Sequence, residues 1–230
     1  MMWKIWVAAL CVVAPLSLGA ARAEDLDSEH LFGFTEGADI GEKGEKEGEF
    51  GIFGRLGKRS GRYVGLIQSN ELKLTLTDNF RIAPGVLFSN YNIHSVPGLP
   101  NYNGGGLDGF SFEMKYHVLD RETAPFGLTL AMASAYSRID PMGGGRQSAL
   151  GTNIFVSLDK ELIHGKFLGA LNLGWAPNVT QTPGASGWER ASDLNVSGAL
   201  SWRMAEKIFL GGEVRYARTF DGLTFNHSAG

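Results

Sequence analysis

The side chains that could do chemistry in this chain are few and far apart. His117 lies close in sequence to Ser111, Glu113 and Lys115, and a serine activated by a nearby histidine can cleave an ester such as that of a lipid. A histidine that simply faces a polar interior accounts for the same residues. No two histidines have the short spacing typical of metal ligands (His30, His94, His117, His164 and His227). We therefore predict no enzyme activity, no catalytic residue, no metal site and no cofactor.

Two runs of three glycines, at residues 104–106 and 143–145, could in principle cradle a phosphate group. Neither run joins a buried strand to a helix, and neither is followed by the Lys-Ser/Thr pair of a phosphate-binding loop. We expect both runs to form flexible loop tips.

The overall charge argues against a nucleic-acid partner. The 230-residue chain has a net charge of -3 and a sequence pI of about 6.0. It therefore lacks the basic surface with which proteins bind phosphate backbones. Its 32 glycines show no triplet repeat, so we expect them to lie within ordered structure.

Residues 1–23 have the parts of a secretory signal peptide. Lys4 makes the start positive, residues 5–20 are apolar, and Ala21-Arg22-Ala23 precede the expected cleavage site. Cleavage before Glu24 would remove Cys11, the one cysteine of the sequence, so the exported protein would contain no disulfide.

Residues 24–46 are strongly acidic. Residues 24–50 contain ten acidic residues and two lysines, whereas residues 51–230 contain 17 basic and 14 acidic residues. We interpret residues 24–46 as a solvated periplasmic leader that precedes the first strand. The acids lack the alternating ligand spacing of a calcium loop.

From about residue 47 onward, apolar and polar residues alternate with the period of a β-strand. In residues 193–203, for example, Leu194, Val196, Leu200 and Trp202 alternate with polar or small residues. The same pattern predicts nine strands, near residues 47–57, 62–76, 79–92, 109–119, 125–138, 148–160, 166–176, 190–203 and 207–219.

One face of these strands is apolar, and the other carries small and charged groups. Ten ionisable residues share the polar face, and we predict that they line the lumen of a barrel: Glu71, Lys73, Arg81, Glu113, Lys115, His117, Asp159, Arg203, Glu213 and Arg215. Because both signs of charge occur, cross-strand ion pairs are expected. They would either set the selectivity of a pore or close a narrow barrel.

Strand length and loop length favour a barrel whose apolar face meets lipid. Strands of about ten residues can cross a bilayer, whereas globular strands average about five or six. Every second connection is long and rich in Gly and Pro, at residues 96–108, 139–147 and 179–189. Aromatic residues gather toward both ends of the strands, as in the interfacial girdles of membrane barrels.

This combination resembles bacterial outer-membrane β-barrel proteins over the signal peptide and about residues 45–220. It is also similar to an uncharacterised group of such proteins in which the segment LFGFTEGADIGEKGEKE, residues 31–47 here, precedes the first strand. Barrels of this kind usually end on an aromatic residue, but this sequence ends with Asn226 to Gly230. We therefore predict that residues 47–230 form a barrel that is incomplete at its C-terminus, with about ten or twelve strands when complete.

The predicted fold is an all-β, antiparallel, up-and-down transmembrane β-barrel in the outer membrane of a Gram-negative bacterium. Its expected partners are outer-membrane lipids and lipopolysaccharide, the outer-membrane assembly machinery and, for an open lumen, small solutes. Its expected function is a passive pore for small solutes or a structural barrel of the envelope. Two alternatives remain: an outer-membrane lipid-modifying hydrolase, and a soluble exported β-barrel that binds an apolar ligand.

Overall fold

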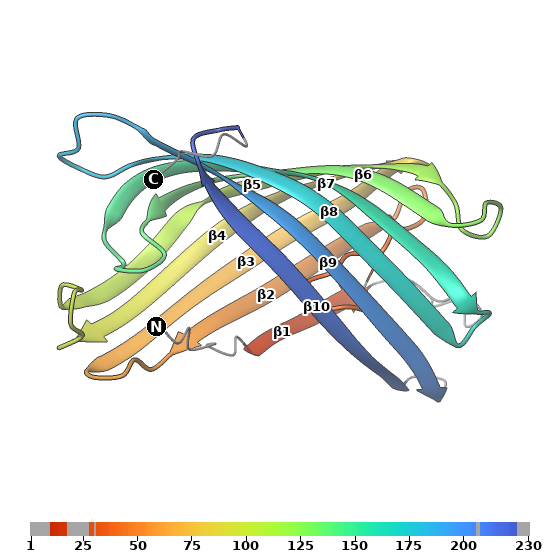
Figure 1. The fold of residues 1–230 in the computed structure, drawn as a ribbon, viewed down its shortest axis with the longest axis horizontal. Helices are drawn as coiled ribbons and strands as arrows, with labels where there is room; N and C mark the ends of the chain where they lie inside the picture. Colours follow the sequence, from red (N-terminus) through yellow and green to blue (C-terminus); the bar gives the residue numbers. More distant parts are fainter. Residues whose placement is uncertain (1–9, 18–27, 30, 206–207, 225–230) are drawn as a thin grey trace.

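The computed structural model describes residues 10–17, 28–29, 31–205 and 208–224. These residues form one antiparallel sheet of ten strands in sequential order (Figure 1). Among them, no helix is long and apolar enough to cross a membrane. The strands are β1 (Leu10–Ser17), β2 (Lys46–Leu56), β3 (Arg62–Thr77), β4 (Phe80–His94), β5 (Tyr102–Leu119), β6 (Gly127–Ile139), β7 (Arg146–Ile163), β8 (Phe167–Gln181), β9 (Glu189–Ala205) and β10 (Ile208–Asp221).

Strands β2–β10 correspond to the nine strands predicted from the alternation. The largest difference is in β5, which begins at Tyr102 and so includes the first glycine run, where a flexible loop tip was expected. A Cβ on Gly105 would lie 2.3 Å from the backbone oxygen of Ser89, so glycine lets β5 lie this close to β4. The expectation of a loop tip was wrong for residues 104–106. Residues 143–145 do lie in the turn between β6 and β7.

Strand β1 falls within the predicted signal peptide. Its backbone pairs with β2 from Leu10 opposite Gly54 to Ser17 opposite Glu47. In the uncleaved chain β1 is therefore an edge strand, and removal of residues 1–23 would leave β2 at that edge. Cleavage itself stays a prediction.

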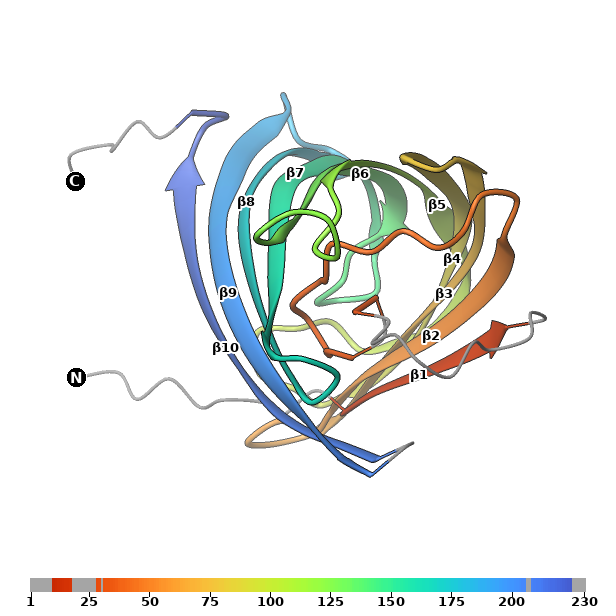
Figure 2. The ribbon, with the colours of Figure 1, turned by 90° about the vertical axis from the view of Figure 1, so that its right-hand side faces the viewer.

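The sheet curls into a half-barrel. Strands β2–β10 are 11 to 18 residues long, and long twisted strands coil a sheet about an axis. In the described part of the chain the sheet remains open, with β1 and β10 at its two edges (Figure 2).

The convex and concave faces of the half-barrel differ sharply in polarity. Leu130, Leu171 and Leu200 point outward and are 47%, 48% and 48% exposed. Their strand neighbours on the concave face, such as Thr129 and Ser201, are buried. This arrangement reverses that of a water-soluble barrel, in which apolar side chains fill the interior.

The acidic segment before β2 lies inside the curve of the sheet (Figure 2). Residues 28–29 and 31–45, here called the inner segment, contain the buried residues Ser28, Thr35, Ala38 and Ile40. The structure thus differs from the solvated leader expected from the sequence. The physical reason is that the concave face offers cations and hydrogen-bonding groups that take the place of water around its acids.

Candidate functional site

The register of β2–β5 places a row of charges on the concave face. Lys73 of β3 stands opposite Glu47 of β2, and Arg81 of β4 stands opposite Lys115 of β5. Like charges directly opposite each other destabilise a sheet. The Arg81 and Lys115 pair therefore needs nearby anions, of which Glu113 of β5 is one.

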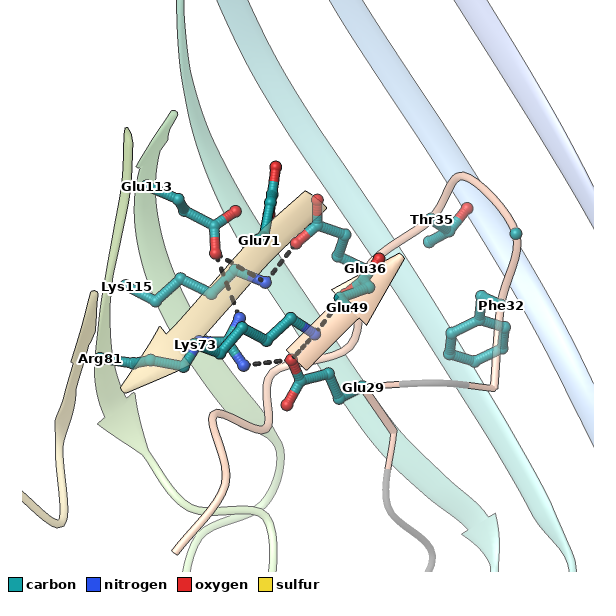
Figure 3. Close-up of a pocket in the computed structure, with 11 residues that line it drawn as sticks. Glu29, Phe32, Thr35, Glu36, Glu49, Glu71, Lys73, Arg81, Glu113 and Lys115 are labelled. Atoms are coloured by element: carbon teal, nitrogen blue, oxygen red, sulfur yellow. Dashed lines mark hydrogen bonds and ion pairs between the residues drawn. The ribbon is translucent and has the colours of Figure 1, made fainter. Parts of the chain in front are cut away.

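Glu29 of the inner segment supplies another of these anions. Its carboxylate forms ion pairs with Arg81 and with Lys73, the latter at 2.5 Å (Figure 3). Lys73 also lies 2.6 Å from a carboxylate oxygen of Glu49, and Arg81 lies 3.1 Å from one of Glu113. Glu29 thereby joins the inner segment to two neighbouring strands.

The ionisation of Glu29 follows from these neighbours. Burial alone would raise the pKa of Glu29, but the positive charges of Arg81, Lys73 and Lys115 outweigh it and lower the pKa from 4.5 to about 2. Glu29 therefore remains charged across the physiological pH range.

Glu36 supplies a further anion. Its carboxylate forms an ion pair with Lys115, which is buried and also lies 3.7 Å from Glu113. The Asn172 amide of β8 holds the backbone of Glu36 from the other side, accepting from its N–H at 2.6 Å and donating to its carbonyl at 2.7 Å. Glu36 thus connects β5 to β8 across the lumen.

Strand β10 holds the inner segment through a single carboxylate. Glu213 accepts hydrogen bonds from the backbone N–H groups of Gly33, Phe34 and Thr35, the last at 2.8 Å. Three converging N–H groups stabilise a carboxylate strongly.

A third group of contacts lies beside the short turn between β5 and β6. Arg121 donates to Asp39 at 2.7 Å and to the buried Asp159 at 3.1 Å, and the Ala38 N–H donates to Asp159 at 2.8 Å. The carbonyl of Ala38 accepts from His117 Nδ1 at 2.7 Å. Both polar groups of the Ala38 backbone are therefore satisfied inside the half-barrel.

A cavity of about 250 Å³ lies between the inner segment and β2–β5 (Figure 3). Its charged lining consists of five carboxylates and three cations: Glu29, Glu36, Glu49, Glu71, Glu113, Lys73, Arg81 and Lys115. The cations are all paired, so these residues act as an ionic lock on the inner segment. Among the described residues, no group of three His, Cys, Asp or Glu side chains is placed to hold a metal ion.

The lumen is also filled at the end where the long loops lie. Tyr63, Tyr91, Ile93 and Val96 form a buried apolar cluster there. The Tyr63 hydroxyl donates to the carbonyl of Met142 at 3.1 Å, which fixes the β6–β7 turn over the cluster. The inner segment and this tyrosine cluster therefore occupy opposite halves of the lumen.

The structure brings together most of the lumen residues predicted from the sequence. Eight line the cavity or contact its lining or the inner segment: Glu71, Lys73, Arg81, Glu113, Lys115, His117, Asp159 and Glu213. Two lie apart from this group. Arg215 is exposed and donates to Asn195 at 2.7 Å, and Arg203 stacks over the Phe209 ring at 6.0 Å.

The candidate hydrolase pair has separate partners. The Ser111 hydroxyl donates to Glu71 at 3.3 Å, whereas His117 contacts Ala38 and Thr129. His117 therefore serves to hold the inner segment in this structure.

Sequence reasoning missed the residues that the inner segment contributes. Glu29, Glu36 and Asp39 were assigned to solvent, and Arg121 and Asn172 were not singled out. One signal was present, because the strong excess of acids in residues 24–50 is accompanied by a small excess of cations in residues 51–230.

A family model described as "Family of unknown function (DUF6662)" matches residues 24–226. No curated protein and no solved structure shows a significant match to the chain.

Proposed function

Because the chain belongs to this family of unknown function, we propose its role from its own geometry: an integral β-barrel of a bacterial outer membrane whose lumen is closed by the inner segment. The observation that carries the proposal is the polarity of the sheet. Exposed apolar side chains cover the convex face, and the ion pairs lie on the concave face.

The convex face is costly to expose to water. Leu130, Leu150, Ile154, Leu171 and Leu173 form part of a continuous apolar surface over β6–β8, and each is about half exposed. Burying apolar area in hydrocarbon is favourable by about 25 cal/mol per Å². Soluble monomers rarely carry apolar patches of more than a few hundred Å². A lipid environment satisfies this surface without a further protein partner.

The connections give the orientation. In outer-membrane barrels the short turns face the periplasm and the long loops face outward. On this basis Arg121 and the β5–β6 turn lie on the periplasmic side, and the tyrosine cluster lies on the outer side. Within a bilayer both sheet edges must be paired, because unpaired backbone groups there cost several kcal/mol each.

The filled lumen favours a structural role over a permanently open pore. The inner segment holds β3, β4, β5, β8 and β10 through charged and backbone contacts. The tyrosine cluster closes the opposite half. Passage of a solute would require both to move.

Two measurements test the proposal. The full-length protein, expressed in a Gram-negative host, should require detergent for extraction and should migrate differently on gels with and without heating. Recovery in the periplasmic fraction without detergent would instead support a soluble barrel. In planar bilayers the folded protein should give no discrete current steps, and steady conductance would contradict a closed lumen.

A further inference from the structure

A second hollow, of about 540 Å³, lies at the long-loop ends of β5, β6 and β7. The residues that matter for its chemistry are Leu107, Tyr136, Arg138, Arg146, Gln147 and Ser148. We call it the rim hollow. It is separate from the cavity beside the inner segment, and neither the ionic lock nor the tyrosine cluster explains its two arginines.

The two arginines of the rim hollow have no ionic partner among the described residues. Within the described residues, neither Arg138 nor Arg146 forms an ion pair, and no Asp or Glu lines the hollow. Arg138 donates to the carbonyl of Leu107 at 2.8 Å, a neutral partner that orients the guanidinium and leaves its charge available.

The nearest carboxylates in the sequence are engaged elsewhere. Asp108 is buried and accepts from the hydroxyls of Ser89 and Ser137 and from backbone N–H groups of β6. Asp140 accepts from two N–H groups of its own turn. Neither carboxylate forms an ion pair with Arg138 or Arg146 among the described residues.

The two arginines point to the convex side. Arg138 shares the strand parity of Tyr136, and Arg146 shares that of Leu150, both of which are exposed on that face. Three further exposed arginines have convex parity near the same end of other strands: Arg62, Arg190 and Arg218. In the proposed membrane orientation, the long-loop ends of these strands face the outer leaflet.

We propose that the rim hollow binds a phosphate group on the head group of an outer-leaflet lipid, an inference that rests on the proposed membrane location. The forked guanidinium donors of Arg138 and Arg146 suit a phosphate, which accepts two parallel hydrogen bonds from each. The Tyr136 and Ser148 hydroxyls, 3.5 Å apart, add neutral donors beside them. Exposed Leu150, which pairs with Tyr136 and lies four residues from Arg146 toward the middle of β7, is placed for contact with the acyl chains.

The site is tested with the full chain folded in detergent micelles that contain lipid A bearing both of its phosphates. Native mass spectrometry should detect a bound lipid A molecule. The variants Arg138→Gln and Arg146→Gln should each reduce binding about tenfold or more, because each removes charge-assisted hydrogen bonds. Lys160→Gln is the matched control, since Lys160 is exposed with the same parity near the other end of β7.

The other outcomes distinguish the sources of phosphate and the two proposals. Equal binding of lipid A with its phosphates removed would overturn the site. Binding that inorganic phosphate abolishes at equal concentration would show a free-phosphate site instead of a lipid site. A protein that inserts and shifts on heating, yet binds lipid A equally in all variants, would refute the rim hollow and leave the membrane barrel standing. Failure to insert would refute both.

Discussion

Replacing Glu29 with glutamine should release the inner segment from the half-barrel. The change keeps the size of the side chain but removes the charge that bridges Arg81 and Lys73. Arg81 is 1% exposed and, among the described residues, would retain only Glu113 as an ionic partner. A buried cation that loses a partner destabilises the structure around it.

The magnitude follows from the pKa of Glu29. Its fall from 4.5 to about 2 corresponds to about 3 kcal/mol, at about 1.36 kcal/mol per pKa unit. If the inner segment opens locally while the sheet stays folded, this loss raises the open population about a hundredfold.

Cysteine alkylation can measure that population. Thr35 is 3% exposed, and cysteine is close to threonine in size, so Thr35→Cys in a Cys11→Ser background reports opening of the segment. Alkylation should be slow in this parent and about a hundredfold faster after Glu29→Gln. The control is Glu42→Gln, because Glu42 is an exposed acid of the same segment.

Two results would refute the reasoning. Equal alkylation rates for the parent and Glu29→Gln would show that the ionic lock does not hold the segment. Equal acceleration by Glu42→Gln would show that net charge, and not the bridge, matters. The heat-dependent gel shift must persist in each variant, which separates local opening from loss of the barrel.

Three further predictions concern pH, the turn contacts and the convex face. Because the pKa of Glu29 is lowered from 4.5 to about 2, its contribution to holding the inner segment is fully present above pH 4.5 and is lost as the pH falls through 2. Pepsin should therefore cut the inner segment increasingly over that range. A Glu29→Gln protein should lack this pH dependence. Asp159→Asn should speed alkylation of Thr35→Cys to a similar degree, because Asp159 holds both Arg121 and the Ala38 N–H. Breaking a buried ion pair costs about 3–5 kcal/mol. An unchanged alkylation rate would show that the contacts beside the β5–β6 turn do not hold the inner segment. Leu173→Arg, at an exposed position near the middle of β8, should lower the free energy of unfolding in vesicles by about 2–4 kcal/mol, whereas Leu56→Arg at the end of β2 should cost about 0–1. Urea titration measures both, and equal costs would argue against a lipid-facing Leu173.

The strands could be predicted from the sequence because the alternation of apolar and polar residues is a property of adjacent residues. Leu194, Val196 and Leu200 show the outward face directly, since a strand places every second side chain on one side. The start of β5 could not be predicted in this way, because a glycine run indicates a loop unless the neighbouring backbone is known to be close. That knowledge came only from the approach of Gly105 to Ser89.

The candidate site was harder to predict because its contacts are distant in sequence. Glu36 and Asn172 are 136 residues apart, and no local pattern joins them. Lys73 and Arg81 were placed on the polar face, but their partner Glu29 lies in a segment whose composition alone indicates solvation. The complementary charges of the two regions were the one usable signal, and they specify attraction without specifying geometry.

The inner segment can be hydrophilic because the sheet carries its apolar side chains on the convex face and its polar side chains on the concave face, the reverse of a water-soluble barrel. With the apolar side chains directed outward, the concave face must be polar, and a segment that fills it must offer charges and backbone groups. Such contacts attach several strands to one short segment: Glu29 holds the neighbouring strands β3 and β4, Glu36 links β5 to the distant β8, and Glu213 brings in β10. The segment therefore acts as an internal brace across the open half-barrel. Glu36 spans the half-barrel most directly, because its carboxylate pairs with Lys115 of β5 while Asn172 of β8 holds its backbone from the other side.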